Sequence, residues 1–118
     1  MPGRIVAGVL GGAPADDALR RTFAEALRRG ASVAVIAAGP ATTRQDRRVR
    51  DLVHRWDEQY PAIEVTLTVS REIDPVFTLA AASRDSDLLV IQQSTDALTA
   101  AIVEDLAHLS HSALLIVD

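Results

Sequence analysis

The stretch DLLVIQQSTDALTAAIVEDL, which runs from Asp87 to Leu106, decides the fold of this chain. Its first part, DLLVIQQ, is a continuous apolar run that predicts a buried β-strand. Its later part repeats apolar residues at helical spacing and predicts a helix. The turn between them contains no glycine, although nucleotide-binding proteins usually have glycines at such a turn. The stretch therefore predicts one strand–helix unit, and it raises the question of whether this turn binds a ligand.

The rest of the chain repeats this strand–helix unit in both directions. We expect strands at 4–10, 32–40, 62–70, 87–93 and 112–118, and helices at 15–30, 42–61, 74–86 and 95–110. Strict alternation of strands and helices implies right-handed crossovers and a parallel sheet. Segment 62–70 alternates apolar and polar residues, so we expect it to be an edge strand. Residues 1–118 are predicted to form one domain, a three-layer α/β/α sandwich with a doubly wound, five-stranded parallel sheet in the order 3-2-1-4-5.

The predicted helices carry apolar stripes that should face the sheet. In the first helix the stripe consists of Leu19, Phe23, Ala26 and Leu27. In the second it consists of Val49, Leu52, Val53, Trp56 and Tyr60, and in the last of Leu98, Ile102, Leu106 and Leu109. Gly30 is a suitable end for the first helix, and Asp74 followed by Pro75 is a suitable start for the third.

Composition narrows the class of protein. The chain has 118 residues and a net charge of −4, which argues against nucleic acid or an anionic membrane as a partner. It has no cysteine, which excludes disulfides, thiol catalysis and cysteine-bound metal. All 12 basic residues are arginine, which together with the many alanines suggests a GC-rich bacterial genome. The apolar runs are too short to span a bilayer, and the N-terminus runs directly into a strand. We therefore expect a cytoplasmic protein.

The predicted ligand site lies where the winding of the sheet reverses, between the first and fourth strands. It would be built from 10–14 and 92–96, with 37–40 nearby. GVLGGAPADD lacks the glycine spacing of a dinucleotide-binding fingerprint, and a P-loop or a phosphorylated receiver domain would need a lysine. We exclude these three functions. Gly11 and Gly12 permit either close approach of a ligand or a tight turn, and both interpretations stay open.

The charged residues and histidines are better explained by roles at helix ends and on the surface than by catalysis or metal binding. Asp16 and Asp17 suit the start of a helix. His108 and His111 lie near the end of the last helix without an evident third metal ligand. His54 lies on the second helix beside Trp56, where packing is a better explanation than catalysis. The arginines of the second helix alternate with acids, which is typical of a solvated face; they are Arg44, Arg47, Arg48, Arg50 and Arg55.

Four segments together resemble the universal stress protein family over nearly the whole chain. They are RIVAGVLGGAPADDALRRTFAEALRRGASVAVI, YPAIEVTLTVS, DPVFTLAAASRDSDLLVI and LAHLSHSALLIVD. Their order and spacing are similar to those of that family. The resemblance implies an adenine nucleotide alpha hydrolase-like fold, and a last strand that pairs across a dimer axis.

The chain departs from the family at the site where ATP-binding members hold the nucleotide. Those members carry Gly-x2-Gly-x9-Gly-[Ser/Thr] after the fourth strand. Here the first glycines align with 92–96, and the final Gly-Ser pair aligns with Ala100 and Ala101. The acid that usually ends the first strand is Leu10, and the serine that follows aligns with Gly12. The turn is therefore not expected to bind ATP in the family's manner.

The leading hypothesis is a non-enzymatic homodimer that acts in stress response or regulation, with no cofactor. Its dimer interface would be the last strand, with residues Ala113, Leu114, Leu115, Ile116 and Val117, and an unknown protein could be a further partner. The alternative is binding of ATP, AMP or cyclic AMP at an altered site. The residues predicted for such a site are Val9, Leu10, Gly11, Gly12, Ala38, Gly39, Gln92, Gln93, Ser94 and Thr95. An enzyme of the wider adenine-nucleotide hydrolase-like group is a third hypothesis, and no nucleophile–base pair or metal-binding set in the sequence supports it.

Overall fold

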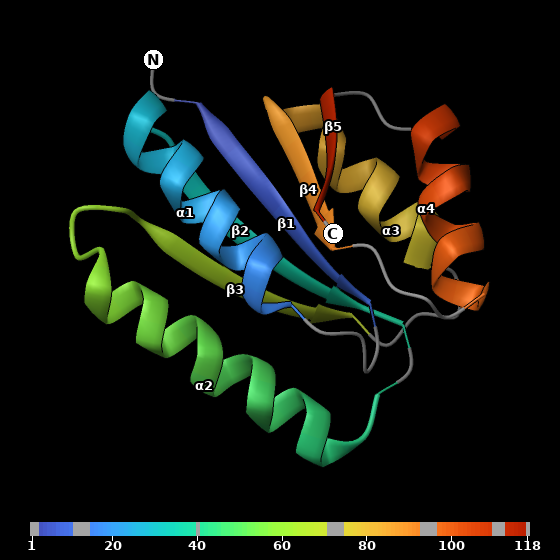
Figure 1. Ribbon diagram of the computed structural model, residues 1–118, viewed down its shortest axis with the longest axis horizontal. Coiled ribbons are helices and arrows are strands. Elements are labelled where there is room, and N and C mark those ends of the chain that lie inside the picture. The colour runs from blue at the N-terminus through green and yellow to red at the C-terminus, as the bar shows by residue number, and fades with distance from the viewer. Residues whose placement is uncertain are drawn as a thin grey trace.

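The computed structural model describes residues 3–10, 15–39, 41–70, 75–92, 97–109 and 113–117, with only the backbone described at 97–99. Strands and helices alternate along the chain (Figure 1). The strands are β1 (Arg4–Leu10), β2 (Ser32–Ala38), β3 (Val65–Ser70), β4 (Leu88–Gln92) and β5 (Ala113–Val117). The helices are α1 (Asp16–Arg29), α2 (Thr43–Gln59), α3 (Pro75–Ala82) and α4 (Ala97–Leu109), with a short 3-10 turn at Ser83–Asp85.

The sheet has five strands in the order β3-β2-β1-β4-β5, and every pair is parallel. Ala7 of β1 is in register with Val35 of β2 and with Val90 of β4. The winding reverses between β1 and β4, because β2 and β3 extend the sheet on one side of β1 while β4 and β5 extend it on the other. The predicted sheet order is confirmed.

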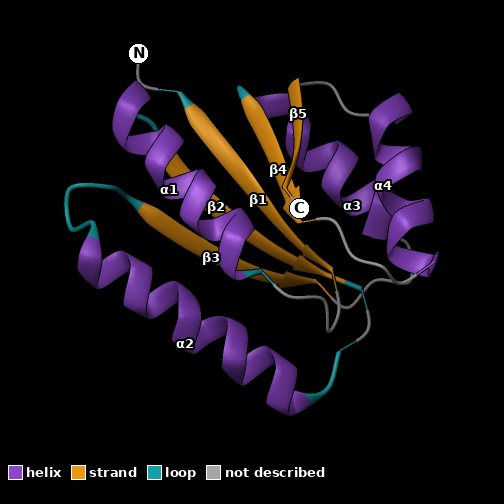
Figure 2. Ribbon diagram, viewed as in Figure 1, coloured by secondary structure: helices purple, strands orange, loops and turns teal. Residues whose placement is uncertain are grey.

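Helices cover both faces of the sheet (Figure 2). α1 and α2 pack on one face, where their side chains form a common core with alternate residues of the strands, among them Ile5, Val35 and Val90. α3 and α4 pack on the other face against the intervening residues, among them Val6 and Leu89. Each central strand is therefore apolar on both faces, as the continuous apolar runs in the sequence predicted.

The edge strand β3 differs from the central strands. Its Val65 and Leu67 pack against the α1–α2 core, whereas Thr66 and Thr68 on the opposite face are exposed. This confirms the prediction of an edge strand with one face in contact with solvent, because no helix covers the threonine side of β3.

Local residue chemistry explains the helix ends. The side chain of Thr42 accepts a hydrogen bond from the backbone N–H of Gln45, and the Gln45 side chain accepts one from the Thr42 N–H. This capping box satisfies two backbone donors at the start of α2. Gly30 ends α1 with φ of 66°, a left-handed conformation that glycine adopts without steric cost. The predicted end of this helix is confirmed.

Three aromatic rings form a stacked cluster between α1 and α2. The ring centroids of Phe23 and Trp56 lie 5.7 Å apart, and those of Phe23 and Tyr60 lie 5.5 Å apart. The pairs are offset-stacked at distances where aromatic rings attract one another. Only 3% of the residues are aromatic, and their spacing along the chain does not indicate that three of the rings meet at one place.

Two residues assigned to apolar stripes turn out to be exposed. Leu27 is 60% exposed, because the buried arc of α1 ends at Ala26 and the next residue is rotated about 100° away from the sheet. Leu109 is 55% exposed, since it is the last residue of α4 and the last buried residue of that helix is Leu106. Val103, which was not predicted, is buried in place of Leu109.

Candidate functional site

The candidate site lies at the carboxyl ends of β1, β2 and β4, around the point where the winding of the sheet reverses. Of the residues predicted to bind a ligand, the structure describes Val9, Leu10, Ala38, Gly39 and Gln92. The other predicted residues lie outside the described part of the chain; they are Gly11, Gly12, Gln93, Ser94 and Thr95.

The ends of β1 and β2 bury their side chains in the two cores. Val9 is 3% exposed and belongs to the α1–α2 core. Leu10 and Ala38 are buried on the opposite face, in the core under α3 and α4. The Leu10 side chain therefore contributes to packing at the position where the resemblance implies an acid.

Gly39 follows β2 and has φ of 85°, a conformation that residues with a Cβ rarely adopt. A Cβ at this position would lie 3.7 Å from Cβ of Pro75, the first residue of α3. Backbone conformation, more than lack of space, thus explains why glycine stands here. The geometry places the end of β2 next to the start of α3.

Gln92, at the end of β4, links this strand to α1. The backbone N–H of Ala18 donates a hydrogen bond to Oε1 of Gln92 at 3.2 Å. Ala18 is in the first turn of α1, where backbone N–H groups have no partner within the helix. Ala15, at the N-cap, makes no capping hydrogen bond with its side chain. At the start of α1, the Gln92 side chain therefore accepts a hydrogen bond from a backbone N–H that a capping residue or a bound anion would accept at other helix starts.

The titratable residues singled out in the sequence lie on different helices in the described part of the chain. Asp16 and Asp17 lie in the first turn of α1, and Asp17 forms an ion pair with Arg20 on the same helix, as the helix-start interpretation predicted. Nε2 of His54 lies 2.9 Å from Oε1 of Glu58 on the exposed side of α2. His108 lies in the last turn of α4, and His111 is outside the described residues. Within the described ranges, no group of three histidines or acids could hold a metal ion.

The strand predicted to form a dimer interface is at the edge of the sheet. Ile116 is 39% exposed, and Ala113 is also exposed. Leu114, Leu115 and Val117 are half-buried; Leu115 and Val117 pack against the α1–α2 core, and Leu114 packs against the other core. β5 thus combines an apolar sequence with partial exposure on both faces.

None of the helices in the described part of the chain is long and apolar enough to cross a membrane.

Comparison with known proteins identifies the fold. No protein-family model matches the chain, and no curated protein matches its sequence. Solved structures do match, and one of them is a universal stress protein from Archaeoglobus fulgidus in complex with dAMP. Its TM-score is 0.69 at 17% identity, and the match covers 100% of this chain and 98% of that one.

Two further solved structures are similar over the same length. A universal stress protein in complex with cAMP has a TM-score of 0.72 at 16% identity, covering 98% of this chain and 96% of that one. Universal stress protein UspA from Lactobacillus plantarum has a TM-score of 0.69 at 15% identity, covering 98% and 97%. This chain therefore has the fold of the universal stress proteins, with a parallel sheet in the order 3-2-1-4-5 and helices on both faces.

Proposed function

We propose that this chain is a universal stress protein-like module that acts as a homodimer in stress response or regulation. It performs no catalysis and does not bind ATP in the manner usual for that family. The fold supports the likeness to that family, the side chains around the winding reversal support the absence of usual ATP binding, and the last strand supports the homodimer.

The observation that carries the proposal is the pairing of Gln92 with the start of α1. Oε1 of Gln92 accepts a hydrogen bond from the Ala18 N–H, so one backbone donor close to the site is already used by the protein. At the end of β1, the Leu10 side chain is buried in the core on the opposite face of the sheet and has no polar group with which to bind a ribose or a phosphate. Both residues stabilise the fold at positions where a nucleotide site needs free polar groups.

The homodimer follows from the character of β5. An apolar strand at the edge of a sheet presents backbone donors and acceptors to any similar strand, and proteins usually cover such an edge or pair it. The exposed side chain of Ile116 would be buried by a second copy of β5. Pairing of two β5 strands is therefore the partner interaction that the described surface favours.

Nucleotide binding at an altered site is the second candidate function. Two solved structures with this fold hold adenine nucleotides, one dAMP and the other cAMP. Among the described residues, the atoms nearest to a Cβ built at Gly39 are Cβ and Cγ of Pro75, at 3.7 and 3.8 Å, which leaves room for close approach of a ligand at the end of β2.

A thermal shift experiment separates the two candidates. The protein is melted alone and with Mg–ATP, ADP, AMP or cyclic AMP. A nucleotide present at about 100 times its dissociation constant adds roughly 2.7 kcal/mol to the free energy of unfolding. In a domain of this size, that raises Tm by about 8–15 °C.

The leading proposal expects Tm to stay within error for all four nucleotides. A shift of the stated size with any of them would overturn it in favour of the altered site. Incubation of the purified protein with Mg–ATP tests the absence of catalysis, and release of phosphate above the buffer rate would contradict it.

A further inference from the structure

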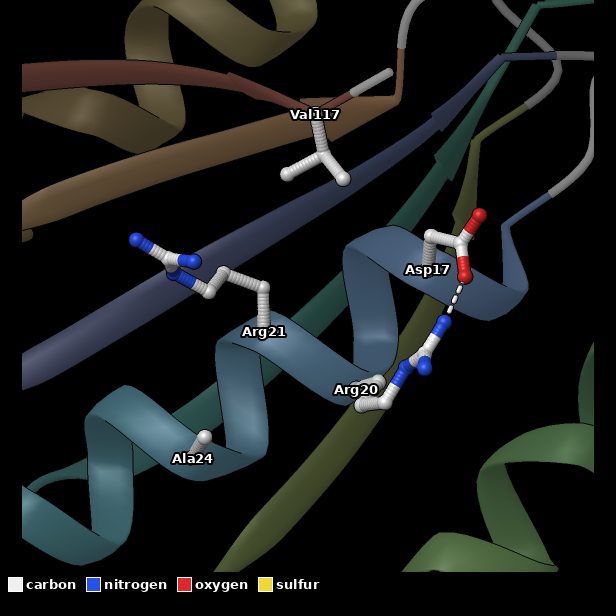
Figure 3. Close-up of a pocket in the computed structure, with 5 residues that line it drawn as sticks. All are labelled: Asp17, Arg20, Arg21, Ala24 and Val117. Atoms are coloured by element: carbon white, nitrogen blue, oxygen red, sulfur yellow. Dashed lines mark hydrogen bonds and ion pairs between the residues drawn. The ribbon is translucent and has the colours of Figure 1, made fainter.

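A cavity lies between α1 and β5, on the face of the sheet that α1 and α2 cover. Its volume is about 510 Å³, within the range of small-molecule sites, and its lining comprises Asp17, Arg20, Arg21, Ala24 and Val117. Val9, Leu10, Ala38, Gly39 and Gln92, the described residues among those predicted to bind a nucleotide, do not line it. In Figure 3, Val117 points from β5 toward α1, and Arg21 extends from α1 on the side away from the Arg20–Asp17 pair.

The two arginines of the cavity differ in whether their guanidinium groups make hydrogen bonds to other side chains. Arg20 donates a hydrogen bond to the carboxylate of Asp17, and the two charges offset each other. Arg21, whose side chain is 57% exposed, forms an ion pair with Glu25 in which Nε lies 3.9 Å from Oε1, too far for a hydrogen bond. Oε2 of the same Glu25 accepts hydrogen bonds from Arg28 at 2.6 Å and from Arg29 at 3.1 Å.

Glu25 is thus engaged by the last turn of α1, and Arg21 makes no hydrogen bond to any residue of the described ranges. A guanidinium carries five N–H donors in a planar fork that fits a carboxylate through two parallel hydrogen bonds. Arg21 therefore presents the cavity with a cation whose donors are available to a ligand.

The remaining lining is apolar. Val117 is half-buried, and Ala24 presents a methyl group on the same side of α1 as the cavity. An apolar wall beside a cation favours a ligand that combines an anionic head with a short hydrocarbon chain. A phosphate or sulfate ion would use only the cation.

We propose that the cavity between α1 and β5 binds a small aliphatic carboxylate. Arg21 holds the carboxylate through paired hydrogen bonds, and Val117 and Ala24 contact the chain. α1 and β5 of a single copy form the cavity, so the site does not require a second copy, although Val117 also belongs to the strand proposed to pair in the dimer.

Amide NMR with hexanoate as the probe tests the site. The full chain is titrated with hexanoate to millimolar concentrations, and separate samples receive inorganic phosphate or hexanol. We expect hexanoate to shift the amide signals of Arg21, Ala24 and Val117 in a saturable manner. Phosphate and hexanol are each expected to bind at least about tenfold more weakly, because each lacks one of the two contacts.

Two variants that make the same charge change locate the cation. Arg21→Gln is expected to weaken hexanoate binding at least about tenfold, since it removes a charge-assisted hydrogen bond. Arg44→Gln removes the same charge from the exposed surface of α2 and is expected to bind hexanoate like the unmodified chain. A dispersed spectrum of each variant verifies that it is folded.

Three results would overturn the proposal. The first is the absence of saturable shifts with hexanoate, and the second is equal loss of binding in Arg21→Gln and Arg44→Gln, which would indicate general attraction of anions. The third is phosphate shifting the same signals as strongly as hexanoate, which would show that the apolar wall makes no contribution.

Discussion

Oε1 of Gln92 lies 3.2 Å from the backbone nitrogen of Ala18, so the end of β4 and the first turn of α1 are joined by a hydrogen bond across 74 residues of sequence. The bond crosses the winding reversal of the sheet, the place where proteins of this architecture usually bind ligands. A polar side chain of the candidate site is thereby used to hold two elements together.

Gln92→Ala is expected to lower the free energy of unfolding by about 1 kcal/mol, since it leaves the Ala18 N–H without its acceptor. Urea unfolding followed by circular dichroism measures the loss. Gln59→Ala, at the exposed end of α2, is the control and is expected to change stability by less than about 0.5 kcal/mol. Equal stability of Gln92→Ala and the unmodified chain would show that the bond does not cap α1 in solution.

The proposed dimer predicts that Ile116→Arg produces a monomer. Ile116 is 39% exposed, so the arginine can reach solvent in one copy but places charge against the second copy in a paired edge. Leu115 would be a less clear probe, because it packs against the α1–α2 core and its replacement also affects folding. Size-exclusion chromatography with light scattering measures the molecular mass.

Leu27→Arg provides the matched control for the dimer experiment. Leu27 is 60% exposed on α1, and the same substitution there is expected to leave the dimer intact. If Ile116→Arg elutes at the mass of the unmodified protein while that protein is dimeric, the interface lies elsewhere. If the unmodified protein is itself a monomer, the proposal of a dimer fails.

Gly8→Ala is expected to destabilise the fold by about 1–3 kcal/mol through overpacking. A Cβ at Gly8 would lie 3.1 Å from both Cδ atoms of Leu79 and 3.2 Å from Cδ1 of Ile91, and both side chains are fully buried. A Leu79→Ala background removes two of these three close contacts and leaves the one with Ile91, so the added cost of Gly8→Ala should fall. Urea unfolding of the four proteins in this cycle measures the coupling, and additive costs would contradict the packing explanation.

Glu25 predicts a pH dependence of stability. The hydrogen bond from Arg28 holds the pKa of Glu25 below its ordinary value of 4.5, and the charges of Arg28 and Arg29 act in the same direction. Folding thus favours the carboxylate, so this contribution to stability is present above the ordinary pKa and is lost as the pH falls through the lower pKa of the folded state. Glu25→Gln is expected to lose less Tm than the unmodified chain when the pH is lowered from neutral to well below 4.5.

The control for this experiment is Glu104→Gln, which makes the same change at an exposed position on α4. Glu104 forms no ion pair with an arginine of the described ranges. A Tm profile of Glu25→Gln that coincides with that of the unmodified chain at every pH would contradict the prediction.

Most of the fold could be predicted because its determinants are local. Continuous apolar runs indicate the central strands, and the alternation in β3 indicates an edge. β5 is the other edge and is partly exposed although its run is also apolar. The apolar stripe predicted for α1 wrongly included Leu27, which is exposed. Helical spacing indicates which way an apolar face points, but it does not indicate how wide a part of the helix the sheet and α2 cover.

The candidate site could be predicted less well because its contacts are between distant residues. The sequence indicated the place of Gln92 at the winding reversal, but its bond to Ala18 depends on how α1 is positioned over β4. The presence of the cavity between α1 and β5 likewise depends on how closely Arg21 of α1 and Val117 of β5 are positioned in the fold. No spacing in the sequence encodes either relationship, and the predicted roles of Val9, Leu10, Ala38 and Gly39 in ligand binding stay predictions.

The two edges of the sheet, β3 and β5, have opposite properties, and this difference sets a limit on assembly. β3 exposes Thr66 and Thr68 on one face and is covered by α2 on the other, whereas β5 presents apolar side chains on both. Two β5 edges that pair about a two-fold axis use the same surface on each copy, so the contact closes on itself. Each end of the resulting continuous sheet is then a β3 edge with exposed threonines. Growth into a filament would require two β3 edges to pair, and the exposed threonine face of β3 offers no apolar surface for that contact. The strand order would therefore allow pairing at β5 and end assembly at β3.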